Sequence, residues 1–154
     1  MGSAVRAEAS KRAGVKVKAM LCLEMIGRLS DAPGSQEFPN PLLGLLYPCR
    51  GNFLALIGRP SEAGLLRRVK RAMKSGSALP VRSMTAPTFL FFGMTLSDHS
   101  NYWDAGYPAL MVTDTAFLRN MDYHTAEDTP GKLDYARMAQ TVQGLHSAIL
   151  ELCR

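Results

Sequence analysis

The segment "VKVKAMLCLEMIG", residues 15–27, decides the class of fold. Its first residues alternate between apolar and basic side chains, and from Ala19 onward it is almost continuously apolar. Such a run is typical of a strand that enters a sheet covered on both faces. Glu24 interrupts the run with a carboxylate. A carboxylate in an apolar strand is costly unless it is paired or binds a metal, so Glu24 is the most informative residue of the chain.

Strand-like and helix-like segments alternate on either side of this segment. Further strands are predicted over 52–59, 79–84, 88–92 and 107–114, and helices over 4–12, 60–74, 97–106 and from Asp134 onward. The alternation predicts an α/β fold with a largely parallel sheet. Residues 28–51 hold four prolines and three glycines, which indicates a long loop of the kind that often has a function.

The last helix has an apolar stripe with the period of an α-helix. Its members are spaced 4, 3, 4 and 3 residues apart: Met138, Val142, Leu145, Ile149 and Leu152. This spacing predicts that the five side chains form the buried face of the helix. His146 lies beside the stripe, where packing at the edge of the core is expected rather than metal binding.

Composition narrows the class of protein. The chain has 154 residues, 47% hydrophobic and 20% charged, which predicts one folded globular domain over residues 1–154. No apolar run approaches the roughly 18–20 residues needed to cross a bilayer, and the N-terminus has no apolar signal block, so no membrane partner is expected and the localisation stays open. Three cysteines with no C-x-x-C motif provide neither a disulfide framework nor a cysteine metal site.

The net charge of +5 raises the question of nucleic-acid binding. Much of the excess lies in "RRVKRAMK", residues 67–74, where apolar residues share the predicted helix with the charges. Aromatic residues that would stack on bases do not alternate with these charges. We therefore expect a solvated helix face and no nucleic-acid partner.

Three polar clusters follow predicted strands, where α/β proteins collect their ligand sites. They are Glu24, the segment "SDHS" at 97–100, and Tyr123-His124 within "DYHTAEDTP" at 122–130. Helix-start chemistry accounts for the Asp-Thr-Pro of the last segment but not for Tyr123-His124. Carboxylate and imidazole are suitable zinc ligands. The residues alone thus leave two interpretations, a metal site or a salt-bridged glutamate with two surface histidines.

Three blocks carry a resemblance to a known family: "LCLEMIG", "SDHSNYWDAGYPALMVTDTAFLRN" and "DYHTAEDTPGKLDYARMAQTV". In order and spacing they resemble the zinc-dependent exopeptidases of metallopeptidase family 28, which include aminopeptidases and are related to glutaminyl cyclases. The resemblance covers essentially the whole chain. It implies a three-layer α/β/α sandwich, a site for two zinc ions, and a peptide as the substrate.

The resemblance also implies roles for individual residues. Glu24 of "LEM" and His124 of "YHT" match zinc ligands of the family. Tyr123 matches a catalytic neighbour that in relatives can stabilise the oxyanion of the tetrahedral intermediate. Asp98 and His99 resemble the "SDH" element near the substrate pocket. Glu24 and His124 are therefore expected to reach one pocket.

The chain departs from the family in front of Glu24. There the family has a histidine, a bridging aspartate and a Glu-Glu pair, whereas this chain has no histidine, no aspartate and only Glu8. The general base and part of the metal site are thus missing, and catalytic zinc normally takes about three protein ligands. We expect the C-terminal portion of a peptidase domain, without its N-terminal strands, that binds zinc weakly or not at all.

Two functions follow from this comparison. The first is a zinc-dependent aminopeptidase that is inactive as this chain alone, with an upstream half-domain or a second copy pairing at an exposed sheet edge. The alternative is a non-enzymatic pseudoenzyme or binding protein on the same fold.

Overall fold

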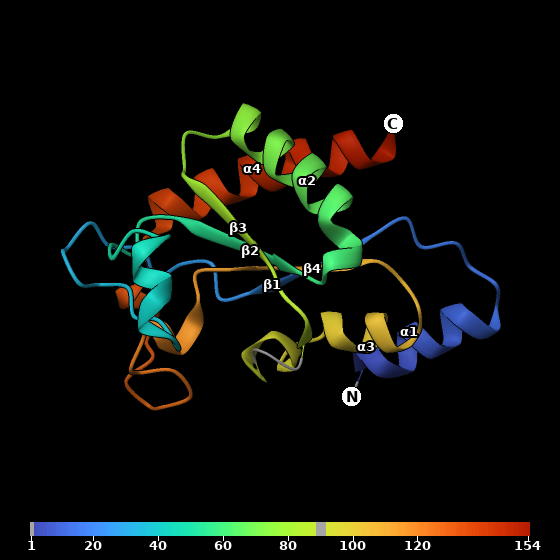
Figure 1. The fold of residues 1–154 in the computed structure, drawn as a ribbon, viewed down its shortest axis with the longest axis horizontal. Helices are drawn as coiled ribbons and strands as arrows, with labels where there is room; N and C mark the ends of the chain where they lie inside the picture. Colours follow the sequence, from blue (N-terminus) through green and yellow to red (C-terminus); the bar gives the residue numbers. More distant parts are fainter. Residues whose placement is uncertain (1, 89–91) are drawn as a thin grey trace.

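The computed structural model describes residues 2–88 and 92–154 and contains one four-stranded sheet (Figure 1). The strands are β1 (Met20–Glu24), β2 (Leu54–Gly58), β3 (Val81–Thr85) and β4 (Ala109–Thr113), and their order in the sheet is β1-β4-β2-β3. The α-helices are α1 (Gly2–Arg12), α2 (Ala63–Gly76), α3 (His99–Asp104) and α4 (Tyr135–Cys153). The strand predicted over 88–92 falls mainly on residues 89–91, which lie outside the described residues.

Two of the three strand pairs are parallel, as predicted for a largely parallel sheet, and the third makes the sheet mixed. β1 pairs in parallel with β4, and β2 pairs in parallel with β3, but β2 and β4 are antiparallel. A strand-helix-strand pattern requires parallel pairing only for strands joined by a crossover, as α2 joins β2 to β3. The alternation in the sequence left the direction of the central pair undetermined.

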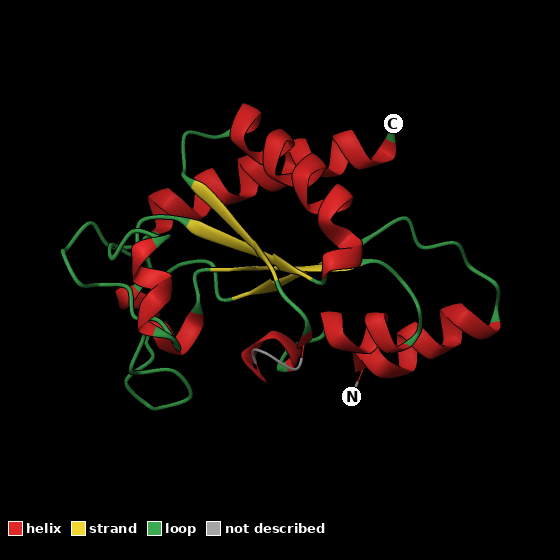
Figure 2. Ribbon diagram, viewed as in Figure 1, coloured by secondary structure: helices red, strands yellow, loops and turns green. Residues whose placement is uncertain are grey.

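Helices cover the two faces of the sheet to different extents (Figure 2). α2 and α4 pack on one face over a core that includes Leu54, Leu56, Leu110 and Val112. On the other face α3 contributes Trp103, and α1 packs against α3. The rest of this second face is left for the loops, and this is where the site lies.

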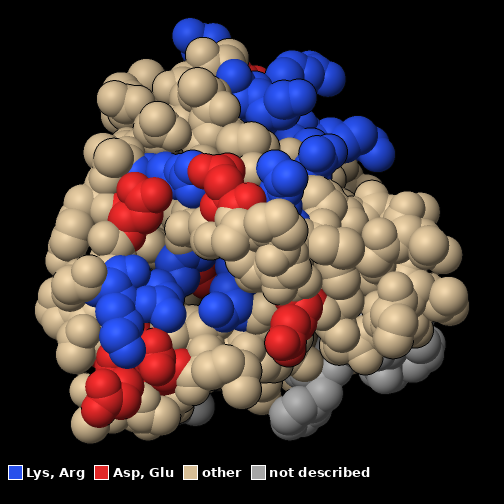
Figure 3. Space-filling model, turned by 90° about the vertical axis from the view of Figure 1, so that its left-hand side faces the viewer, with Lys and Arg blue, Asp and Glu red and all other residues tan. Residues whose placement is uncertain are grey.

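The helix α2 shows the amphipathic pattern that its charges predicted. Leu66, Val69, Ala72 and Met73 are buried. Arg67, Arg68, Arg71 and Lys74 are exposed. Lys and Arg side chains gather in the upper part of Figure 3, on the side of the molecule where α2 lies in Figure 1, whereas both signs of charge are interspersed around the loops. No helix among the described residues is long and apolar enough to span a bilayer.

The buried face of α4 differs from the predicted stripe. Leu145 is buried, but Val142 and Ile149 are 58% and 51% exposed. The helix instead buries small residues at Thr141, Gly144 and Ala148. A Cβ at Gly144 would lie 3.3 Å from the Met73 carbonyl oxygen, so the small residues let α4 approach α2 closely. The apolar stripe of α4 is therefore wider than the face of the helix that is buried in the described structure.

Candidate functional site

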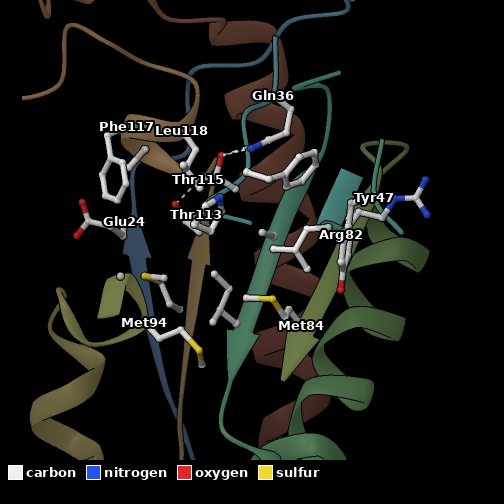
Figure 4. A pocket seen from close by; sticks show the side chains of 18 of the residues that line it. Glu24, Gln36, Tyr47, Arg82, Met84, Met94, Thr113, Thr115, Phe117 and Leu118 are labelled. Carbon is white, nitrogen blue, oxygen red and sulfur yellow. Dashed lines mark hydrogen bonds between the residues drawn. The ribbon is translucent and has the colours of Figure 1, made fainter. Parts of the chain in front are cut away.

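A cavity of about 720 Å³ opens on the second face of the sheet (Figure 4). Its floor consists of apolar side chains from three strands and from the segments next to them, among them Phe53, Ala55, Ile57, Met84, Met94 and Met111. Residues 38–47 of the long loop form one wall, and Phe117, Leu118 and Tyr123 form another. The long loop predicted over 28–51 therefore contributes to a cavity.

One row of paired residues crosses the whole sheet beneath this cavity. Glu24 pairs with Thr113, Thr113 with Ala55, and Ala55 with Arg82. All four residues line the cavity, so their side chains share one face. Glu24 lies at one side of the cavity, and Arg82 lies beside Tyr47 at the other (Figure 4). The cavity thus has an acidic end, a basic end and a small, mostly apolar middle.

The Glu24 carboxylate is held by a serine from another element. The Ser97 hydroxyl donates to Oε2 of Glu24 at 2.6 Å and also lies 3.2 Å from the Cys22 sulfur. Glu24 is half-buried and is the last residue of β1. A carboxylate with one oxygen bonded to a serine keeps the other oxygen available to a ligand in the cavity.

The backbone that follows Glu24 is clamped by a buried aspartate. Asp114, fully buried after β4, accepts hydrogen bonds from the backbone N–H groups of Gly27, Arg28 and Ala116. Burial raises the pKa of the Asp114 carboxyl, while the three N–H groups oppose the rise. Asp114 therefore ties the end of β1 to the turn that carries Phe117 and fixes two parts of the site relative to each other.

The Tyr123-His124 loop is tied to the same region. Asp122 binds Arg28 at 3.2 Å and Lys132 at 2.9 Å, and the Lys132 hydrogen bond is the main cause of its lowered pKa. His124 has a left-handed φ of 62°, and its ring stacks on that of Tyr123 with 3.9 Å between the ring centroids. Burial and the nearby charge of Glu24 raise the pKa of Tyr123.

The structure brings some of the predicted residues together and separates others. Glu24 and Tyr123 line one cavity, whereas His124 is exposed, stacks on Tyr123 and is not among the residues that line the cavity. The expectation that Glu24 and His124 reach one pocket is therefore not met in the described structure. His99, predicted near the substrate pocket, is instead fully buried, and its Nε2 lies 2.6 Å from the Met94 carbonyl oxygen. Its ring packs edge-on against Trp103, and burial lowers its pKa. Its side chain supports the floor from behind and does not line the cavity.

Asp98 also lies apart from the cavity. It is exposed, it is absent from the cavity lining, and its carboxylate accepts a hydrogen bond from Ser3 of α1 at 2.6 Å. Asn101 donates to the same serine hydroxyl at 2.8 Å. In the described structure these contacts fasten α1 to α3.

The side chains present match zinc in kind but not in number. Glu24 and His124 offer a carboxylate and an imidazole, which are common zinc ligands. Within residues 2–88 and 92–154, no three His, Cys, Asp or Glu side chains form a group that could hold a metal ion. A zinc site that uses Glu24 and His124 as ligands therefore needs further ligands from outside the described residues.

The sequence alone assigned no role to three residues of the site, although Ser97 lies within the polar segment 97–100. Arg82 is a charged residue of β3, and charged side chains of strands usually face solvent. Ser97 stands beside the more conspicuous Asp98, and Tyr47 lies in a loop without a recognisable motif. Only the register of the sheet reveals Arg82, because the row that joins it to Glu24 crosses three pairs of strands.

Comparison with known proteins assigns the chain to a family. The family model described as peptidase family M28 matches residues 1–149. Uncharacterized protein YfbL of Escherichia coli strain K12 is 48% identical over 145 residues, which cover 94% of this chain and 44% of that protein. This chain therefore spans less than half the length of that curated relative.

Two solved aminopeptidase structures share the fold. LapA aminopeptidase of Legionella pneumophila has a TM-score of 0.71 at 16% identity and matches 98% of this chain with 35% of its own length. The aminopeptidase from Aneurinibacillus sp. strain AM-1 has a TM-score of 0.61 at 19% identity, over 98% of this chain and 30% of its own. At these identities the likeness concerns the α/β fold alone.

Proposed function

The chain belongs to peptidase family M28, and on this basis we propose that it supplies the substrate pocket and part of the metal site of a zinc-dependent aminopeptidase. Such an enzyme hydrolyses the N-terminal peptide bond of its substrate. The observation that carries the proposal is the cavity itself, in which Glu24 and Tyr123 meet over an apolar floor. A concave, mostly apolar pocket with a few convergent polar groups is the usual form of a substrate site.

In this proposal Glu24 and His124 are zinc ligands. Ser97 orients the Glu24 carboxylate, and the Tyr123 ring supports the His124 imidazole by stacking. When bound, zinc would polarise a carbonyl group and lower the pKa of a water molecule. The general base and the remaining ligands would come from polypeptide outside this chain.

Tyr123 acts as a hydrogen-bond donor in this proposal. Its phenol is protonated at neutral pH because an ordinary tyrosine has a pKa of about 10. A protonated phenol at the edge of the cavity could donate to the oxygen on which negative charge develops during hydrolysis. The apolar floor would receive a large apolar side chain from the N-terminal residue of the peptide.

A partner polypeptide is the second part of the proposal. We use the name complementing segment for the part of YfbL that its match with this chain does not cover. This segment is the available source of the strands and ligands that the site needs. We propose that it pairs with the outer edge of β1, which has only β4 as a neighbour among the described strands.

The chain purified alone is expected to release no amino acid from leucine p-nitroanilide above a protein-free blank, with or without added zinc. The reason is that the described residues contain no group of three potential metal ligands. Co-expression with the complementing segment should produce activity that a chelator removes and zinc restores. Turnover by the lone chain that depends on zinc would contradict this prediction.

Replacing Ser97 with alanine is expected to weaken zinc binding about tenfold in the co-expressed protein, the usual effect of losing a hydrogen bond to a metal ligand. The change removes the 2.6 Å bond to Glu24. Chelator competition measures the affinity. Ser75→Ala is the matched control, because the Ser75 hydroxyl donates to the Ala72 carbonyl oxygen within α2 and lies outside the cavity lining. Equal losses in both variants would show that Ser97 has no specific role.

A non-enzymatic binding protein is the second candidate, and the absence of a three-residue metal group among the described residues favours it. The DNA just upstream of the first codon separates the two candidates. An in-frame segment that encodes a histidine, an aspartate and a Glu-Glu pair supports the peptidase. Without such a segment, the pocket is best explained as a binding site.

A further inference from the structure

The cavity has charges of opposite sign at its two ends. Glu24 and Arg82 are the outer members of the row Glu24–Thr113–Ala55–Arg82. Between them lie only threonine and alanine, so the row leaves open space above its middle. A ligand that lies along this row meets a carboxylate at one end and a guanidinium at the other.

The basic end has no acidic partner within the described part of the chain. Arg82 forms no salt bridge there, and neither do its basic neighbours Lys70 and Lys74. Lys70 donates to the Ser83 hydroxyl at 2.9 Å. Burial together with the charges of Lys74 and Arg82 lowers the pKa of Lys70, which shows that the cations repel one another here. An anion at this end would relieve the repulsion.

The length of the row limits the size of a ligand that touches both ends. Three steps between neighbouring strands, each of about 4.8 Å, separate β1 from β3 by about 14 Å. An extended peptide covers about 3.3–3.6 Å per residue. A chain of about four residues therefore spans the row, whereas a tripeptide of about 10–11 Å and the side chain of a single aspartate or glutamate are too short.

We propose that Arg82 is a specificity-determining residue that binds the free C-terminal carboxylate of a short peptide. The substrate class would then be peptides of about four residues with an apolar first residue. The inference rests on the proposed function, because it places the N-terminus of the peptide at the Glu24 end. Tyr47, beside Arg82 in the cavity, is held by its hydrogen bond to the Ser83 carbonyl oxygen at 3.0 Å and forms a firm wall for this end.

Binding of matched peptides tests this inference without any turnover. The probes are Leu-Ala-Ala-Ala with a free C-terminal carboxylate and the same peptide with a C-terminal amide, titrated calorimetrically at low salt. The titration is made on the chain alone and on the chain co-expressed with the complementing segment. The acid should bind about fivefold more tightly than the amide, as expected for a partly exposed ion pair. Leu-Leu should show no such preference, because its carboxylate does not reach Arg82.

Two variants assign the preference to its source. Arg82→Gln should remove the preference for the acid, whereas Lys74→Gln, which makes the same change of charge outside the cavity lining, should retain it. Equal binding of acid and amide would overturn the role of Arg82. If Met84→Lys in the floor then weakened both peptides equally, the proposed substrate pocket would stand without that role. Failure of both peptides to bind in either form of the protein would overturn both proposals.

Discussion

Co-expression with the complementing segment is expected to raise the thermal midpoint of this chain strongly and to prevent its aggregation. The physical reason lies at one side of the molecule, where β1 has a free edge and Leu23 is 50% exposed. On the exposed side of α4, Tyr135, Val142 and Ile149 follow one another at intervals of seven residues and are 58%, 58% and 51% exposed. Covering about 400 Å² of apolar surface contributes about 10 kcal/mol, as much as the whole stability of a typical domain.

Calorimetry and sedimentation of the two forms measure this effect. Val142→Lys and Ile149→Lys should abolish the gain, because a lysine cannot be buried in the contact without a partner. Val5→Lys is the matched control, since Val5 is an exposed valine on α1. The proposal would be contradicted if the lone chain unfolded cooperatively as a monomer and the complementing segment left its thermal midpoint unchanged. That result would favour a self-sufficient binding protein.

Replacing His124 with alanine is expected to lower the activity of the co-expressed protein by at least about a hundredfold, because a metal ligand contributes more than the groups that orient it. The loss should appear in kcat and should not be restored by saturating peptide. Initial rates with leucine p-nitroanilide over a range of zinc concentrations measure it.

His146→Ala is the matched control for this variant. His146 is exposed on α4 and does not line the cavity. It removes the same side chain without touching the site, so its activity should match that of the unaltered protein. Similar losses in the two variants would show that His124 has no specific part in the reaction.

The sequence predicted the elements of the fold well where local patterns decide them. The continuous apolar run ending in Asp114 formed the fully buried strand β4, and the cap residue Asp134 begins α4. The sequence-based predictions failed where contacts between distant parts of the chain decide the structure. The direction of β2 relative to β4 and the exposure of Val142 both depend on which elements pack beside them. The spacing of apolar residues along the chain does not show this.

The site was predictable to a similar degree. The anomalous carboxylate of Glu24 and the unexplained Tyr123 marked two residues of one cavity, although about 100 residues separate them. His99 looked equally polar in the sequence but packs against Trp103 in the core, because a histidine can be buried neutral with one ring nitrogen bonded. The position of Arg82 at the cavity was not predicted from the sequence, because it depends on the register of three strand pairs.

Zinc retained after exhaustive dialysis tests the central claim most directly, namely that this chain supplies part of a zinc peptidase site. The measurement is the metal content of the co-expressed protein, compared with that of its Glu24→Ala and His124→Ala variants. The account predicts that the unaltered protein retains zinc and that each variant loses part of it, while His146→Ala retains it fully. Equal zinc contents in all four proteins, or no zinc in the unaltered one, would contradict the account.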